Sequence, residues 1–376
     1  MAESNKKINP SSNLKSGDRV KLCYVLPKFD LETDTHFFYI YFLINEASKK
    51  IDISLIIEES NSDISFFQNI QNIYIQKFKW LPLRFLENLA LIIWNRIKGY
   101  NNFYVHYSYI SAFNAGLISR ITKAKTFYWN CGMVWLFGKD KFLKIILNMV
   151  NFLVTGVESL KKGYADNYNI SLNKIKIMPN WIDLVRFQNI EHNFIYSKYN
   201  LEKDRVYVLF LHRLAKRKGA HYIVPVAKAL KDLNIKFLIA GDGPYEDILK
   251  QEIKDNELKN VRLLGRVPNK EVSALMKVSK LFFMPSEEEG FPRVLLESMA
   301  SGLPFVVSDI GGVREISTEE EQEFIFKIGN VEAMSNAIKK ILNDSDFYEK
   351  LKGTNLKQVQ QFDIKEVSQI FINLFK

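Results

Sequence analysis

Short runs of hydrophobic residues alternate with longer amphipathic stretches along most of this chain. In the first half these runs predict β-strands at residues 20–26, 53–57, 103–106, 126–129, 152–155 and 175–178. After a polar stretch at residues 189–204, a second series predicts strands at residues 206–211, 235–240, 261–264, 280–284 and 304–308. Because segments of helical period separate most of the runs, we predict parallel sheets with helices on both faces.

The two series predict two Rossmann-like domains, joined near residues 185–200. We expect a polar N-terminal tail at residues 1–18, a first domain at 19–190, a second domain at 191–355 and a final helical segment at 356–376. A chain of 376 residues has the usual length for two domains. The expected fold class is therefore α/β.

The positive charge of the chain is concentrated in its first half. Residues 1–180 hold 23 Lys and Arg against 14 Asp and Glu, a net charge of +9, whereas the remaining residues hold 29 against 28, a net charge of +1. Nucleic acid, an anionic membrane or an acidic substrate would each account for a basic half, and so would a basic surface without a partner.

Two segments of the basic half, residues 76–100 and 133–154, mix Lys and Arg with Trp, Phe, Leu and Ile. Peripheral membrane segments have this composition, and so do amphipathic helices that pack against a core. No apolar stretch reaches the roughly 20 residues of a membrane-spanning helix. The polar N-terminus and two distant cysteines, Cys23 and Cys131, indicate a reducing, cytoplasmic location.

The most informative stretch is residues 285–316, PSEEEGFPRVLLESMASGLPFVVSDIGGVREI. A predicted strand ends at Met284, a turn with three carboxylates follows, Pro292 suits the first turn of a helix, and Gly302 ends that helix. In open α/β sheets, ligands bind at the carboxyl ends of strands, where helix N-termini attract phosphate. Acidic residues there can accept hydrogen bonds from sugar hydroxyls, although each acid by itself also fits a structural role.

The order of residues in segment 285–316 resembles the C-terminal domain of retaining glycosyltransferases of family 4, which have the GT-B fold. The E-x7-E signature of that family is Glu289 and Glu297. Two further segments of the family are FLIAGDGP at residues 237–244 and VRLLGRVP at residues 261–268. The resemblance covers residues 20–376 and is stronger in the second half.

Residues 210–224, FLHRLAKRKGAHYIV, resemble the phosphate-binding loop of the same family. Arg213, Lys218 and Gly219 match the family pattern, whereas His212 replaces its usual glycine. The resemblance implies two domains facing each other across a cleft, with the final helix packed back on the first domain. It also implies transfer of a sugar, with retention, from a nucleotide-diphosphate sugar to a glycan or lipid-linked acceptor in cell-surface polysaccharide or glycoconjugate biosynthesis. No cofactor, metal or nucleic acid is implied.

Site residues follow from the same resemblance, position by position. It implies catalytic roles for Glu289, Arg213 and Lys218. Donor contacts are implied for Glu297, at the ribose, and for Gly290, Phe291, Pro292, Arg266 and Val267. Expected contacts to the acceptor or sugar are His36, His106 and Asn130.

The first half departs from the family pattern at two places. Residues 34–36 stand where many members have a glycine-rich turn, and Asn130 or Cys131 stands where a histidine is frequent. Asn130 can hydrogen-bond a sugar hydroxyl but cannot act as an acid or base. Two alternatives therefore stay open: a sugar-nucleotide epimerase of GT-B architecture, and an inactive protein that binds nucleotide sugars. The basic first half also suits peripheral contact with an anionic membrane at its cytoplasmic face.

Overall fold

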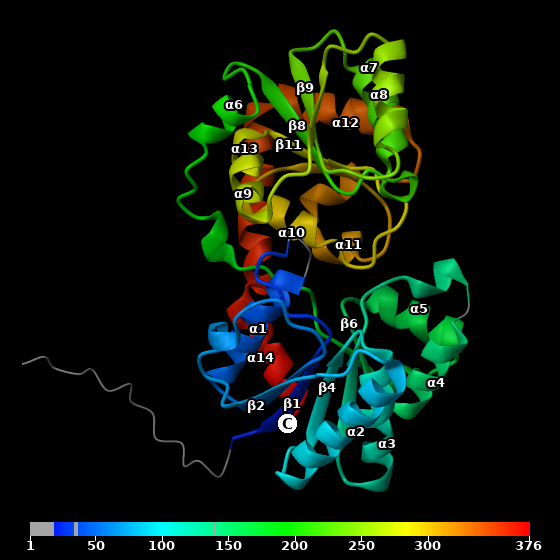
Figure 1. Cartoon of the computed structure of the whole chain (residues 1–376). Coiled ribbons are helices and arrows are strands. Elements are labelled where there is room, and N and C mark those ends of the chain that lie inside the picture. The colour runs from blue at the N-terminus through cyan, green and yellow to red at the C-terminus, as the bar shows by residue number, and fades with distance from the viewer. Residues whose placement is uncertain (1–18, 34–36, 139) are drawn as a thin grey trace, which may run out of the picture.

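The computed structural model describes residues 19–33, 37–138 and 140–376. These residues form two α/β domains, which lie one above the other in Figure 1. The first contains a seven-stranded parallel sheet in the order β3-β2-β1-β4-β5-β6-β7. Its strands are β1 (Lys21–Leu26), β2 (Asp52–Ile57), β3 (Asn72–Ile75), β4 (Asn102–His106), β5 (Lys125–Trp129), β6 (Phe152–Thr155) and β7 (Ile175–Ile177).

Helices cover both faces of this first sheet. They are α1 (Phe37–Ser48), α2 (Leu81–Ile97), α3 (Tyr109–Ile121), α4 (Lys141–Met149) and α5 (Glu158–Tyr168), with a short 3-10 helix, η2 (Val134–Phe137), before α4. The strand order reverses between β1 and β4, which are neighbours in the sheet. A crevice at such a reversal is the usual place for a ligand in an open parallel sheet.

The second domain repeats the arrangement with six parallel strands in the order β10-β9-β8-β11-β12-β13. The strands are β8 (Val206–Leu211), β9 (Ile235–Ala240), β10 (Val261–Gly265), β11 (Leu281–Met284), β12 (Phe305–Ser308) and β13 (Ile325–Phe326). The helices are α6 (Asn193–Lys198), α7 (Ile223–Ala229), α8 (Glu246–Asp255), α9 (Asn269–Val278), α10 (Arg293–Ala300), α11 (Val313–Ile316), α12 (Val331–Asn343) and α13 (Ser345–Gln358).

After α13 the chain returns to the first domain. The backbone of Ile182 donates to Phe362 and accepts from Ile364, so the outgoing and returning segments pair where they cross. The final helix, α14 (Ile364–Asn373), packs beside α1, and its Phe371 ring meets Tyr104 of β4 edge to face. The expected fold of two Rossmann-like domains with a final helix on the first domain is confirmed.

All of the strands predicted from apolar runs are present, within one residue at each end. Two strands, β3 and β13, were not predicted. Both lie at the edge of a sheet, and most of their residues are only partly buried. An edge strand buries less side-chain surface than a central one, so it lacks the continuous apolar run that marks a central parallel strand.

A carboxylate that pairs with no cation among the described residues is buried in the second domain. Glu321 is 0% exposed, and its Oε1 accepts a hydrogen bond of 2.6 Å from Nδ2 of Asn355 on α13. Burial raises the pKa of Glu321 to about 8, despite hydrogen bonds from Asn355 and the Phe305 backbone. Among the described residues, neither Oε2 of Glu321 nor Oδ1 of Asn355 has a partner. A proton on Glu321 would remove the charge that has no cation partner among these residues.

Glu321→Gln should therefore stabilise the protein in mildly alkaline buffer. The folded pKa of about 8 exceeds the usual 4.5, so the folded state keeps a proton that the unfolded chain releases. Stability is then fully present below pH 4.5 and falls as the pH rises toward 8. Glutamine supplies an N–H donor that does not titrate, so the free energy of unfolding at pH 8 should rise by about 1–3 kcal/mol. Urea unfolding at pH 5.5 and pH 8 measures the difference.

The matched control is Glu323→Gln, on the same 3-10 helix, η7 (Glu320–Phe324), but exposed and paired with Lys340 at 2.6 Å. Its unfolding free energy should change little at either pH, because surface ion pairs contribute little. A Glu321→Gln variant that is less stable than the wild type at pH 8 would show that the carboxylate is charged in the folded state.

Candidate functional site

The carboxyl ends of the two sheets face each other, and the loops that follow the strands meet between the domains. The loops of the second domain include residues 212–219, 285–292 and 309–312, and those of the first include residues 130–132 and 156–158. A Cβ at Gly290 would lie 2.0 Å from the carbonyl oxygen of Cys131, and one at Gly312 would lie 2.8 Å from Val157. Backbone of one domain thus lies directly against the other.

Glu289 is the centre of a buried polar cluster in this region. Its Oε1 lies 2.9 Å from Lys218 Nζ, 2.9 Å from Ser286 Oγ and 3.0 Å from His212 Nε2. Lys218 also donates to the carbonyl oxygen of Glu288 at 2.6 Å. These residues follow β8 and β11, which are adjacent in the sheet. The tertiary structure therefore joins the two predicted segments, 210–224 and 285–316, at one carboxylate.

Gly219 makes this approach possible. Its φ is +76°, and a Cβ there would lie 2.0 Å from the carbonyl oxygen of Pro285. Any other residue would both strain the backbone and push the two loops apart. The geometry of the two loops therefore requires glycine at position 219, where the sequence matched the family pattern.

The negative charge of Glu289 is stabilised in this cluster. Burial by itself would raise the pKa of the carboxyl, but the charge of Lys218 and the hydrogen bonds from His212 and Lys218 lower the pKa well below its usual value. Glu289 is therefore ionised throughout the neutral range. Within the part of the chain that the structure describes, no residue donates to its Oε2. This second oxygen is the acceptor left for a ligand hydroxyl.

Arg213 and Lys218 differ in how far the protein satisfies their charges. Lys218 is 9% exposed and is held by Glu289, whereas Arg213 is exposed and forms no ion pair with any described residue. The backbone N–H groups of Gly290 and Phe291 form no backbone hydrogen bond in the described chain. A free guanidinium and free N–H groups at strand ends are suited to an anion such as a diphosphate.

Glu297, on α10, faces the first domain. It accepts a short hydrogen bond from the hydroxyl of Tyr39 on α1. Burial raises the pKa of Glu297, while Tyr39, Arg186 and Arg293 lower it. Arg293 lies 4.3 Å from the centre of the Tyr39 ring and donates to the carbonyl oxygen of Trp181 at 2.6 Å. The tyrosine hydroxyl therefore occupies Oε1 of Glu297, and a ribose that bound this oxygen would have to displace the hydroxyl.

Tyr39→Phe should therefore strengthen nucleotide binding if Glu297 holds the ribose. The nucleotide would no longer have to break the Tyr39–Glu297 hydrogen bond, and one hydrogen bond corresponds to roughly a three- to tenfold change in Kd. Isothermal titration with UDP, GDP, ADP and dTDP measures the effect. Tyr41→Phe is the matched control, because its hydroxyl donates to Lys28 on the same domain at 3.0 Å. Weaker binding in Tyr39→Phe alone would instead place Tyr39 among the nucleotide contacts.

Other hydrogen bonds hold the two domains together around the site. The carboxylate of Glu315 on α11 accepts from the backbone N–H groups of Glu158 and Ser159, both at 2.8 Å. It thereby caps the first turn of α5 from the opposite domain, where negative charge is favourable. Asn180 donates to the carbonyl oxygen of Phe291 at 3.0 Å. The predicted donor-contact residues Gly290 and Phe291 thus also form the domain interface.

Arg266 and Val267 come directly after β10, at the carboxyl end of the second sheet, with Arg266 exposed and Val267 buried. Pro292 is the N-cap residue of α10, directly before Arg293. These positions lie at the same sheet end as Glu289, as the predicted donor site requires.

The three residues expected to contact acceptor or sugar have different surroundings. His106 is 1% exposed, and its Nδ1 forms a hydrogen bond of 2.8 Å with the Tyr24 hydroxyl. Its ring lies beside the Trp129 ring. This burial speaks against a direct ligand contact by His106. Asn130 lines an open pocket of about 510 Å³ at the carboxyl ends of β1, β4 and β5. His36 lies outside the described residues.

That pocket supplies residues that sequence reasoning missed. Its remaining lining residues are Pro27, Tyr107, Ser108, Cys131, Gly132 and Val134. Tyr107 follows β4 with a φ of +59°, a conformation that is uncommon for a large side chain. Each residue directly follows a strand or lies in a loop, and the order of strands in a sheet cannot be read from these positions alone. Ser286 was missed for the same reason, and His212 was placed in the phosphate-binding loop without its contact to Glu289.

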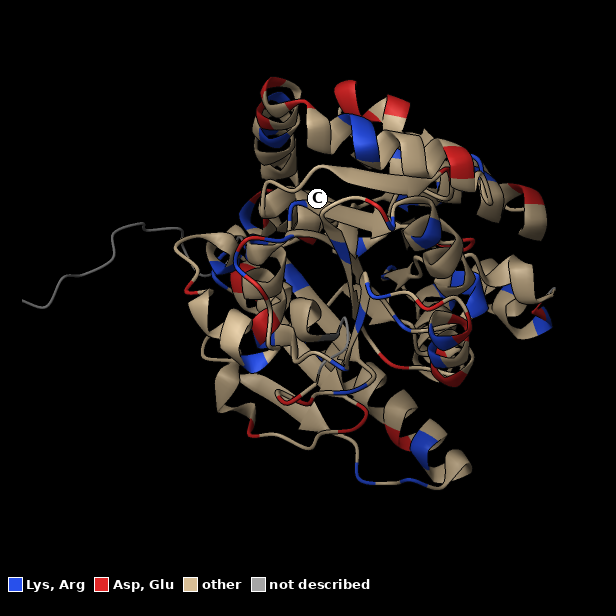
Figure 2. Ribbon diagram, turned by 90° about the horizontal axis from the view of Figure 1, so that it is seen from above, with Lys and Arg blue, Asp and Glu red and all other residues tan. Residues whose placement is uncertain are grey.

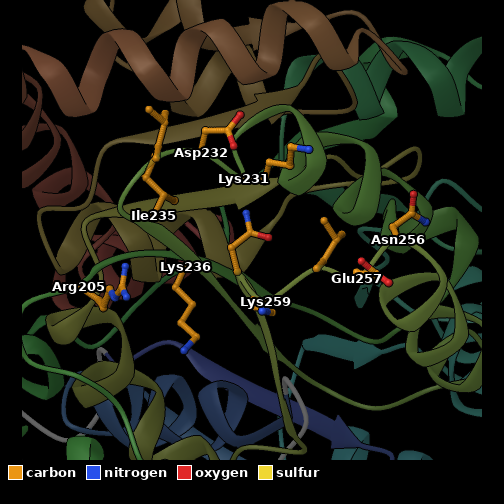
Figure 3. A pocket seen from close by; sticks show the side chains of 11 residues that line it. Arg205, Lys231, Asp232, Ile235, Lys236, Asn256, Glu257 and Lys259 are labelled. Atoms are coloured by element: carbon orange, nitrogen blue, oxygen red, sulfur yellow. The ribbon is translucent and has the colours of Figure 1, made fainter.

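A second pocket, of about 390 Å³, lies at the opposite end of the second sheet. Figure 3 shows its charged side chains, among which Lys231 and Lys236 point in different directions. Because ligands of parallel α/β sheets bind at the carboxyl ends of the strands, this pocket near the amino ends is not the donor site. The charges around it are mixed, and Lys236 pairs with Glu202 at 3.3 Å.

The described residues of the candidate site include no cluster of metal-binding side chains. Among the described residues, no group of three or more His, Cys, Asp or Glu is placed to hold a metal ion. The chain has one Asp-x-Asp pair, Asp344 and Asp346, and Asp344 caps α13 by accepting from the Phe347 N–H at 2.9 Å. This pair therefore has a structural partner at the start of a helix.

Comparison with known proteins agrees with this geometry. Residues 192–358, which include the whole Glu289 cluster, match the family model described as glycosyl transferases group 1. Residues 192–358 are therefore similar to group 1 glycosyl transferases, and they are called the group 1 domain below. The resemblance of the second half to GT-B glycosyltransferases is thereby confirmed.

Relatives of the group 1 domain include named enzymes. Over 194 residues the chain is 30% identical to 2-deoxystreptamine N-acetyl-D-glucosaminyltransferase of Niallia circulans, and the match covers 50% of each chain. Over 204 residues it is 28% identical to UDP-Gal:alpha-D-GlcNAc-diphosphoundecaprenol alpha-1,3-galactosyltransferase of Escherichia coli, which covers 52% of this chain and 53% of that one. The matched region spans about half the length of these two relatives.

The likeness in fold extends over the whole chain. A solved glycosyltransferase from Rickettsia africae superimposes with a TM-score of 0.78 at 17% identity, and the match covers 96% of this chain and 98% of that one. The GT-B fold is therefore shared by the first domain, the group 1 domain and the final helix.

Proposed function

We propose that the protein is a retaining glycosyltransferase that moves a sugar from a nucleotide-diphosphate sugar to a glycan or lipid-linked acceptor, in the synthesis of cell-surface polysaccharide or glycoconjugate. The observation that carries the proposal is the Glu289 cluster. An ionised carboxylate with one oxygen free lies beside a buried ammonium, at strand ends that face the other domain. The loop that supplies the ammonium also carries Arg213, which is exposed and has no ion pair among the described residues. The named relatives of the group 1 domain support the same reaction class.

In this proposal the donor sugar lies against Glu289, and its diphosphate lies against Arg213 and Lys218. Negative charge grows on the diphosphate as the glycosidic bond breaks, so fixed cations stabilise the transition state more than the ground state. The free N–H groups of Gly290 and Phe291 add donors for the same oxygens. We propose that these groups neutralise the leaving diphosphate without a divalent metal. The leaving phosphate oxygen receives the acceptor proton, so no side-chain base is needed.

The acceptor is proposed to bind in the pocket lined by Asn130 and Tyr107. This pocket lies at the strand-order reversal of the first sheet, and backbone of its loop contacts the donor loop of the second domain at Gly290. A ligand there would meet a sugar held by Glu289. The Escherichia coli relative, by its name, takes UDP-galactose and a lipid-diphosphate acceptor. We propose the same classes of donor and acceptor for this chain.

A thermal-shift screen over UDP-, GDP-, ADP- and dTDP-sugars tests the donor. A nucleotide sugar present at 100 times its Kd should stabilise the folded protein by about 2.7 kcal/mol. Donor consumption is then followed with and without EDTA, and equal initial rates are expected. Release of an epimerised sugar without transfer would support an epimerase. Binding without any consumption, across a panel of acceptors, would support an inactive binding protein.

The first domain also presents apolar residues to solvent. Many of these exposed side chains lie on or beside α2, η2 and α4, and they include Trp80, Leu81, Leu86, Trp94, Ile97, Leu136, Phe137 and Phe142. Exposed Lys77, Lys79, Lys141 and Lys144 lie among them. Core packing does not account for these outward side chains. Lys and Arg elsewhere are mostly interspersed with Asp and Glu along the helices (Figure 2).

We propose that this surface contacts an anionic membrane peripherally, which suits a lipid-linked acceptor. Val134, which lines the proposed acceptor pocket, is the first residue of η2, and the exposed Phe137 is the last. One short helix therefore connects the pocket with the exposed apolar surface. Among the described helices, none is both long enough and apolar enough to cross a bilayer. Contact at the surface would combine apolar insertion with attraction of lysines to anionic lipid.

Phe137→Ser combined with Phe142→Ser should weaken binding to vesicles of phosphatidylserine and phosphatidylcholine by about tenfold at low salt, because two apolar anchors are lost. The two side chains are 72% and 69% exposed, so the fold should be unaffected. Ile248→Ser on α8, at a position 50% exposed in the second domain, is the control. Wild-type protein that stays in the supernatant at low salt would show that the acceptor is not presented by a membrane.

A further inference from the structure

His212 is held at both nitrogens of its ring. The backbone N–H of Arg213 donates to Nδ1 at 2.8 Å, so Nδ1 is an acceptor. A neutral imidazole has one donor and one acceptor nitrogen, which places the proton on Nε2. Nε2 lies 3.0 Å from Oε1 of Glu289 and therefore donates to the carboxylate. The tautomer follows from a backbone group and needs no ligand.

The backbone of His212 is fixed as well. Its N–H donates to the carbonyl oxygen of Ala240 in the neighbouring strand at 3.1 Å. Its own carbonyl oxygen lies against Gly241, where a Cβ would come within 2.0 Å. The ring therefore projects from a rigid strand end, and 22% of the side chain is exposed.

Three donors converge on one oxygen of Glu289. His212, Lys218 and Ser286 all contact Oε1, and they approach from two loops. With Oε1 occupied in this way, rotation of the carboxylate would break three hydrogen bonds at once. The second oxygen is thereby held in one direction. Preorganised acceptors of this kind avoid reorganisation during the reaction.

We infer that His212 is a positioning residue that orients the free oxygen of Glu289 toward the donor sugar, through a neutral ring with its proton on Nε2. The inference rests on the proposed function. A glycine at this position, which the family pattern has, could not supply this hydrogen bond. His212 adds a donor to the carboxylate without adding a positive charge. Protonation of Nδ1 would set that nitrogen's proton against the Arg213 N–H and disrupt the arrangement.

Kinetics of three variants test the role. His212→Ala should lower kcat about tenfold and change the Kd for the nucleoside diphosphate less than twofold, because only the orientation of Glu289 is lost. His212→Gln, whose Nε2 can donate to Oε1, should restore kcat to within about threefold of the wild type. His221→Gln is the matched control, since His221 pairs with Glu287 of the same loop at 3.3 Å. Equal losses in all three variants would overturn the inference and show a general effect of loop packing.

A measurement without substrate separates this inference from the proposed function. Imidazole nitrogen spectra of histidine-labelled protein should show His212 as the neutral Nε2–H tautomer at pH 7.5, with a protected Nε2 proton. That proton should exchange faster with water in Glu289→Ala. A His212 ring that is protonated, or protonated at Nδ1 only, would overturn the inference whether or not the protein transfers sugar. If the tautomer is as expected and no donor is consumed, the proposed function fails while the geometry stands.

Discussion

Arg213→Ala is expected to lower the rate of sugar transfer by about 10²-fold, a loss near 3 kcal/mol of transition-state stabilisation, while leaving thermal stability unchanged. The side chain is exposed and forms no ion pair with any described residue, so its removal costs the fold little. Its guanidinium is the free cation at the proposed diphosphate position. Lys218→Ala should lower the rate at least as much. It should also destabilise the protein, because it removes a cation that lies 2.9 Å from the buried Glu289.

Arg217→Ala is the matched control for these variants. Arg217 belongs to the same loop and is exposed, but it pairs with Glu288 at 3.1 Å. We expect its turnover to stay within about threefold of the wild type, since an exposed ion pair contributes little. Steady-state rates and melting temperatures of all three variants give the comparison. Near-normal turnover in both Arg213→Ala and Lys218→Ala would remove these residues from the diphosphate site.

Gly290→Ala should have an effect of similar size through the domain interface. Its new Cβ would lie 2.0 Å from the Cys131 carbonyl oxygen of the opposite domain, so the two domains could not approach as closely as they do here. The Glu315 contacts with α5 and the Asn180 contact with Phe291 would lengthen with it. A displacement of about 1 Å between donor and acceptor sites can cost about 10²-fold in rate. Nucleoside diphosphate affinity, which depends on the second domain, should change only a few-fold.

Small-angle scattering together with turnover measures this change. The Gly290→Ala variant should give a larger radius of gyration than the wild type, with each domain folded. Gly353→Ala is the control, because nothing lies within 4 Å of a Cβ at that position of α13. Alanine there should preserve activity and slightly raise stability, since it favours the helix. If Gly290→Ala keeps normal turnover, the contact with Cys131 is not part of the catalytically competent arrangement.

The sequence alone determined the two-domain parallel architecture, because strands that are buried on both faces consist of uninterrupted apolar residues. It also located the loop that we propose binds the donor, since Glu289 and Glu297 belong to one short segment in which a strand end, a turn and a helix start follow each other. Gly219 could be recognised in the same way. These features depend on neighbours along the chain, and local pattern is sufficient to find them.

The tertiary structure decided which residues become partners. His212 meets Glu289, Tyr39 meets Glu297, and the N-terminus of α5 meets Glu315, although each pair is far apart in the chain. Such contacts depend on which strand ends are neighbours and how two domains pack, and a single sequence contains no local signal for either. His106 shows the same limit: it stands at the end of a strand, as a ligand-binding residue would, but packing against Tyr24 and Trp129 buries its ring.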